Sequence, residues 1–152
     1  MKKIVIITLL AVLGLIFNSC TKKEKIASET TNKIIQVNDK RISLELNAMQ
    51  KQHQLKNMRN HLEAIQSITM LLSKEKYDIA SRIAYEKLGS TTEMKLMCAS
   101  FGNKNFEEMG LDFHKSADKM SEVFKTKDKN KSLEALSITM NYCTQCHATF
   151  RQ

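Results

Sequence analysis

Apolar residues recur at alternating steps of three and four through most of the chain beyond residue 40, which predicts amphipathic helices. The longest stretch of this kind runs from about Lys40 to Ser73 and predicts one long helix. Its apolar face carries Leu44, Ala48, Leu55, Met58, Leu62, Ile65, Thr69 and Leu72.

A second helical region follows directly. The pattern predicts a helix from about Lys74 to Leu88, and Gly89 is a residue type that commonly ends a helix. A short helical turn comes next, before Gly102-Asn103 breaks the chain again. One face of this turn carries Met94, Met97, Cys98 and Phe101.

Two more long helices complete the chain. One is predicted from Asn105 to Lys125 and the last from about Lys131 to Phe150, with a turn at 127–130 between them. The third helix has an apolar stripe of Phe106, Met109, Phe113, Ala117, Met120 and Phe124. The last helix is predicted to bury Leu133, Leu136, Met140, Cys143, His147 and Phe150.

Four amphipathic helices with short connections predict an all-α domain over residues 40–152. An antiparallel four-helix bundle is the simplest arrangement that buries all four apolar faces. The composition agrees, because the chain has no proline and only four glycines. Residue types that favour helices, such as alanine, leucine, methionine, lysine and glutamate, are common throughout.

The start of the chain has the pattern of a bacterial export signal. Lys2 and Lys3 precede an apolar run from Ile4 to Phe17 that is short for a membrane-spanning helix. We therefore interpret residues 1–19 as a signal peptide and Cys20 as a lipidated first residue. Phe17 stands where a leucine is usual in lipoprotein signals, and the alternative is an ordinary cleavage site that leaves Cys20 a free thiol. Either interpretation predicts an exported, periplasmic protein, and lipidation would anchor it to a membrane.

Residues 20–39 are interpreted as a flexible tether, because they are rich in lysine, threonine, serine and asparagine. The formal net charge of the whole chain is +8. The basic residues are spread along the sequence, which favours a solvated surface over a nucleic-acid site. This charge is compatible with an acidic redox partner.

The motif that carries chemistry is Cys143-Thr144-Gln145-Cys146-His147, close to the end of the sequence. Cys-x-x-Cys-His indicates covalent haem attachment, because two thiols one helical turn apart can bond one porphyrin while the histidine ligates its iron. A Cys-x-x-Cys pair also occurs in redox dithiols, zinc sites and disulfides. Four zinc ligands are hard to find here, since Cys98 is the one other cysteine apart from Cys20.

The segment from Cys143 to Arg151 resembles the C-terminal end of the cytochrome c-prime family. There Cys-x-x-Cys-His is followed by two residues, an aromatic residue and a basic residue, as in Phe150 and Arg151. The resemblance implies a cytochrome c/b562-like antiparallel four-helix bundle with one haem c. It also implies thioether bonds from Cys143 and Cys146, His147 as the proximal iron ligand, and Arg151 beside that histidine. Members of this family commonly pair through their first two helices, which makes a homodimer a further expectation.

The family covers the distal face of the haem with apolar residues of the first helix, and we expect Leu55 and Met58 to form those walls. The first helix of this chain also carries His53, His61 and Met49, and each of these, like Met58 itself, is a candidate sixth ligand. His53 lies off the apolar stripe and is expected at the surface. Elsewhere, copper-favouring ligand types occur whose spacing fits ordinary burial equally well. They are Met94, Met97, Cys98 and His114.

We expect a monohaem electron carrier and not an enzyme, because no nucleophile–base pair is evident. The alternative is a five-coordinate haem module that binds nitric oxide or another diatomic gas. A weaker alternative is a haem-free dithiol or zinc protein. The sixth coordination position of the iron distinguishes the first two functions.

Overall fold

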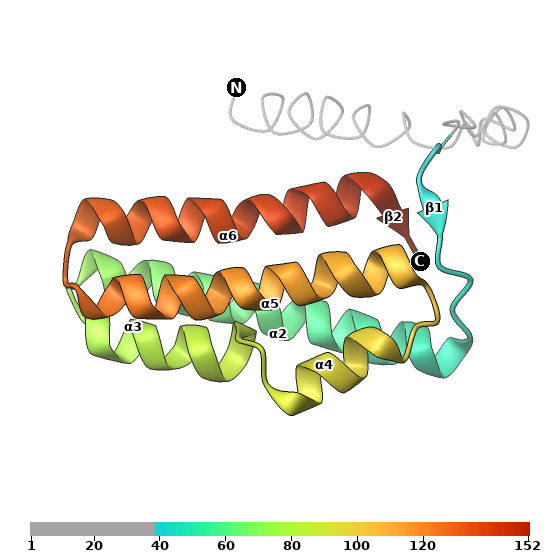
Figure 1. Cartoon of the computed structure of the whole chain (residues 1–152), viewed down its shortest axis with the longest axis horizontal. Helices are drawn as coiled ribbons and strands as arrows, with labels where there is room; N and C mark the ends of the chain where they lie inside the picture. Colours follow the sequence, from blue (N-terminus) through green and yellow to red (C-terminus); the bar gives the residue numbers. More distant parts are fainter. Residues whose placement is uncertain (1–38) are drawn as a thin grey trace, which may run out of the picture. The chain divides into compact units, whose positions relative to one another are not determined.

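The computed structural model describes residues 39–152, which are predominantly helical (Figure 1). The predicted signal peptide, Cys20 and nearly all of the predicted tether therefore lie outside the described residues. Residues 40–152 form one all-α unit. Its elements are β1 (Ile42–Ser43), α2 (Ala48–Ser73), α3 (Tyr77–Ile83), the π-helical segment η1 (Ala84–Leu88), α4 (Thr92–Ala99), α5 (Lys104–Lys125), α6 (Lys129–Thr149) and β2 (Phe150–Arg151).

The first helix begins later than predicted, at Ala48. Asn47 caps it, because its side-chain oxygen accepts a hydrogen bond from the Gln50 amide at 2.9 Å and Gln50 Oε1 accepts one from the Asn47 amide at 3.1 Å. The residues before this cap are drawn into a short parallel pairing, with Ile42 opposite Phe150. The predicted helical start at Lys40 was wrong because a cap and a tertiary strand contact overrule the local apolar pattern.

The second helix also starts later than predicted, at Tyr77, after Glu75 takes a left-handed φ of 56°. It ends at Leu88, as predicted, but the reason for Gly89 is space and not backbone freedom, since its φ is −72°. A Cβ at Gly89 would lie 2.5 Å from the Tyr85 carbonyl oxygen and 2.6 Å from Asp118 Oδ1.

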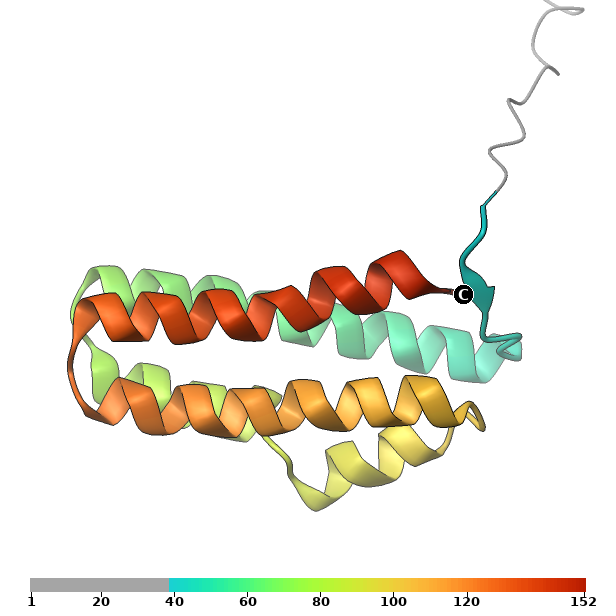
Figure 2. The same ribbon diagram turned by 45° about the horizontal axis from the view of Figure 1, so that its top comes forward.

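Helices α2, α3, α5 and α6 lie along one another, while the short α4 lies apart from their axis, beside α5 (Figures 1 and 2). Small polar residues let α5 approach its neighbours closely. Ser81 and Ser121 join α3 to α5 through mutual hydrogen bonds to backbone oxygens at 2.9 Å. Ser116 and Thr139 join α5 to α6 at 2.9 Å.

The apolar core is divided into two clusters. The larger cluster occupies the half of the bundle near the α5–α6 turn and includes Ile68, Leu72, Ala117, Met120 and Phe124. The smaller cluster is built on three aromatic rings in sequential edge-on contact. Their centroids lie 5.3 Å apart from Phe101 to Phe106 and 5.4 Å apart from Phe106 to Phe150.

The buried face of α6 differs from the predicted one. Leu136 is buried as predicted, but Ser132 and Thr139 accompany it. Leu133 and Met140 are exposed instead. The physical reason is the close α5–α6 contact, which selects small hydroxyl side chains and turns the larger residues outward. Within residues 39–152, no helix combines the length and apolar character needed to cross a bilayer.

We predict that Gly89→Ala lowers the stability of the domain by about 1–3 kcal/mol, because the new Cβ overlaps a backbone oxygen that cannot move freely. The shift in the midpoint of denaturant unfolding measures this. Lys87→Ala, an exposed change in the same segment, should alter stability by less than about 0.5 kcal/mol. Equal midpoints for the Gly89→Ala variant and the parent would contradict the steric explanation.

Candidate functional site

A cavity of about 410 Å³ lies between α2, α4, α5 and α6, within the size range of ligand-binding pockets. It touches both apolar clusters, since its lining includes Ile65 and Phe113 from the larger one and Phe101 and Phe106 from the smaller one. Helix α6 packs along α5 and barely contacts α2. The cavity therefore separates α2 from α6.

The two cysteines and the histidine of the Cys-x-x-Cys-His motif all line this cavity. Cys143 packs against the larger cluster and Cys146 against the smaller one, so the two sulfurs span the division of the core. His147 also lines the cavity but is otherwise exposed, which corrects the prediction that it is buried. Arg41 holds this end of α6 by donating a hydrogen bond from Nη1 to the His147 carbonyl oxygen at 3.3 Å.

The environment of the two motif thiols disfavours ionisation. Burial, with a smaller effect from Cys143, raises the pKa of Cys146 to about 11. Burial likewise raises the pKa of Cys143 above its usual range. A redox dithiol of the thioredoxin type needs the opposite shift, because the thiolate is the reactive form. The site therefore presents two neutral thiols to an apolar space.

The mouth of the cavity exposes large apolar side chains. Leu55 and Met58, the predicted walls, both line the cavity. Leu55 is 46% exposed, Leu62 69% and Met140 42%, so these three lining residues are not the buried core positions that their spacing predicted. Exposed apolar residues gathered around one cavity are typical of a binding site. A flat apolar ligand would remove them from water.

Polar side chains occupy the buried stripe of α2 where apolar ones were predicted. Gln54, Asn57 and His61 are buried and line the cavity. Of the described residues, three have an enclosed side-chain oxygen or nitrogen that lacks a hydrogen-bond partner, and two of these atoms, Gln54 Oε1 and His61 Nε2, belong to this stripe. Sequence reasoning missed Gln54 and Asn57, whose one signal is that they lie seven and four residues before His61, which places all three on one face of the helix.

Two buried histidines meet at the inner side of the cavity. The rings of His61 and His114 lie edge-on with centroids 5.7 Å apart, and Phe113 contacts both. His114 Nδ1 lies 2.6 Å from the Leu88 carbonyl oxygen, which accepts hydrogen bonds only, so this nitrogen carries the proton. Burial, with a smaller contribution from His114, lowers the pKa of His61 to about 4. Burial also lowers the pKa of His114.

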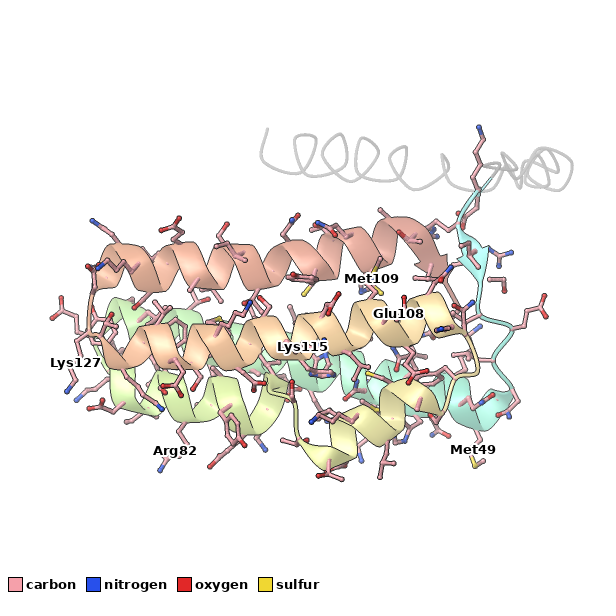
Figure 3. The ribbon with its side chains drawn as sticks, viewed as in Figure 1. Met49, Arg82, Glu108, Met109, Lys115 and Lys127 are labelled. Atoms are coloured by element: carbon pink, nitrogen blue, oxygen red, sulfur yellow. The ribbon has the colours of Figure 1, made fainter. Side chains whose placement is uncertain are left out.

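Three other residues singled out in the sequence are not among those that line the cavity. His53 is exposed, as predicted, and Met49 is 77% exposed and points away from the helices in Figure 3. Arg151 pairs with Ser43 in the strand contact and is not among the lining residues. Among the described lysines and arginines, Arg59 lines the cavity. Sequence reasoning missed it because its position on α2 is exposed.

Of the sulfur-containing residues on α4, the structure places some at the cavity and others away from it. Met97 and Cys98 line the cavity together with His114, whereas Met94 does not. Cys98 is buried, as expected for a packed thiol. No group of three or more histidine, cysteine, aspartate or glutamate side chains is placed to hold a metal ion within residues 39–152.

Neither the family models nor the curated proteins nor the solved structures contain a match to this chain.

We predict that the protein without a bound ligand loses stability as the pH falls from about 6.5 toward 4. The unfolded chain protonates His61 below its ordinary pKa of 6.5, while the folded protein keeps it neutral down to about pH 4. The pKa difference corresponds to about 3 kcal/mol. Urea unfolding at a series of pH values measures the slope.

The matched test is His61→Asn, which removes the titrating group and should flatten this slope. His53→Asn changes an exposed histidine on the same helix and should leave the slope as it is. An identical pH dependence in His61→Asn and the parent would show that other groups cause it.

Proposed function

We propose that this protein is a monohaem c-type cytochrome, similar to cytochrome c-prime, with an antiparallel four-helix bundle and a role in extracytoplasmic electron transfer. The observation that carries the proposal is the convergence of Cys143, Cys146 and His147 on one apolar cavity. Their spacing in sequence suits covalent haem, and their common cavity offers the space that a porphyrin requires.

The residues around the motif fit a haem in three respects. The two thiols stand on opposite sides of the divided core, where each could bond one edge substituent of a single flat group. The exposed apolar residues Leu55 and Leu62 would be covered by the porphyrin ring. Arg59, exposed beside the cavity, offers a cation to the propionate carboxylates.

The attachment chemistry requires no oxidant. Each cysteine S–H would add across one vinyl double bond, so that the sulfur would bond to one vinyl carbon and the hydrogen would go to the other. Burial raises the pKa of both thiols. The iron would then supply one-electron chemistry, and the chain would hold it in a water-poor pocket with His147 as its proximal ligand.

A haem-free dithiol protein receives less support. A dithiol catalyst would need thiols with lowered pKa values, whereas burial raises those of Cys143 and Cys146. Gas binding uses the same cavity and the same proximal histidine, and it differs from electron transfer in an open sixth position on the iron.

We predict that Cys143→Ala and Cys146→Ala each reduce covalent haem, and that the double variant abolishes it, because each change removes one thioether. The protein should be exported from cells that express haem-attachment machinery. Haem staining of denatured protein and the alkaline pyridine spectrum measure attachment. Cys98→Ala is the matched control, since Cys98 lines the same cavity outside the motif. A colourless parent protein under these conditions would refute the proposal.

His147→Ala should retain covalent haem through the two thioethers but alter the spin state of the iron, because the proximal imidazole is lost. Absorption and electron paramagnetic resonance spectra measure this change. Spectra identical to those of the parent would refute the proximal assignment.

The proposed location rests on the N-terminal sequence. Export followed by lipidation of Cys20 would hold the domain at a membrane surface facing the periplasm. We predict that Cys20→Ala releases the exported protein from the membrane fraction into the soluble fraction. Immunoblotting after cell fractionation measures the distribution, and an unchanged membrane association would contradict lipid anchoring.

A further inference from the structure

The cavity holds a buried nitrogen with no partner. His61 is nine-tenths buried, and its Nε2 makes no hydrogen bond in the part of the chain that the structure describes. Buried polar atoms in native proteins are nearly always hydrogen-bonded, so an unpartnered one calls for an explanation such as a bound ligand. Apolar packing explains Met58 fully, because a thioether has no such requirement.

The position of His61 suits a role opposite His147. His61 comes from α2 and His147 from α6, the two helices that the cavity separates. His114 also lines the cavity, but it lies on α5, which packs directly along α6. Two axial ligands must approach a metal from opposite faces, and α2 is the wall that faces α6.

The surroundings of His61 also keep it available as a ligand. Its ring is held between Phe113, with ring centroids 5.1 Å apart, and the edge of His114. The ring of His114 is itself oriented by its hydrogen bond to the Leu88 carbonyl oxygen. Burial keeps the imidazole neutral, which is the form that binds metals.

We propose that His61 Nε2 is the second axial ligand of the haem iron, which makes the iron six-coordinate with two imidazoles. This inference rests on the proposed haem function. It assigns the protein to electron transfer and not to gas capture, because no open coordination position remains. It further implies that Leu55 and Met58 exclude water from the distal side without bonding to the metal.

The experiment uses the full-length exported haem protein. The parent should give a low-spin spectrum in both oxidation states and should bind carbon monoxide weakly in the ferrous form. Near-infrared magnetic circular dichroism should show two imidazole ligands on the iron and no methionine sulfur ligand. His61→Leu should become high-spin and bind carbon monoxide readily, with the same covalent haem content as the parent.

Three variants make this result specific. His53→Leu alters an exposed histidine on α2, and Met58→Leu alters the neighbouring lining residue, and both should keep the parent spectrum. His61→Gly leaves space for free imidazole, which should restore the low-spin spectrum when added. The parent spectrum and this rescue keep the proposal testable if His61→Leu folds poorly.

The outcomes separate the two proposals. A parent without covalent haem refutes the proposed function and this inference together. A parent with covalent haem that is high-spin and binds carbon monoxide refutes the inference alone. A low-spin parent that becomes high-spin in Met58→Leu, but not in His61→Leu, assigns the ligand to Met58 and also overturns it.

Discussion

The separation of α2 from α6 is the constraint on which the rest of the site depends. Helix α2 packs on α3 and η1, and α6 packs on α5, yet α2 and α6 barely meet each other. The core divides at this point into a larger aliphatic and aromatic cluster and a smaller aromatic one. Cys143 and Cys146 stand on the two sides of the division, so the backbone positions both sulfurs before any ligand binds.

The two ends of the cavity are held by different interactions. Toward the α5–α6 turn, buried hydroxyl pairs such as Ser116 with Thr139 bring the helices close together. At the other end, Phe150 packs edge-on against Phe106 while its backbone pairs with Ile42. The segment before α2 therefore pairs with the two residues that follow α6. Together with the contact between Phe106 and Phe150, this pairing limits how far the end of α6 can move away from α5.

Polarity within the cavity follows a simple physical logic. A purely structural α2 would place apolar residues on its buried stripe, as it does at Ile65 and Ile68. Nearer its N-terminus the same stripe carries Gln54, Asn57 and His61. Burial of such polar groups costs free energy unless they gain hydrogen-bond partners, and these three residues all line the cavity. The requirements of apolar packing therefore do not explain this polar stripe.

Local pattern predicted the helices well where one face packs continuously. The stripe of α5 from Phe106 to Phe124 is nearly all buried, as expected from its spacing. Prediction failed where a local cap was overlooked and where contacts between distant segments decide the outcome. Asn47 and the strand contact shortened the first helix, and the Ser116–Thr139 contact rotated the buried face of α6 away from Leu133.

The sequence by itself determined the all-helical character, the helix ends near Leu88 and Lys125, and the chemical motif at Cys143, Cys146 and His147. These depend on periodicity, capping and spacing, which are local properties. Only the tertiary structure decided that these residues share a cavity with His61, His114 and Arg59, because those side chains come from other helices. It also decided that Leu55 and Leu62 border that cavity instead of filling the core, since neighbouring helices determine which face of α2 is covered.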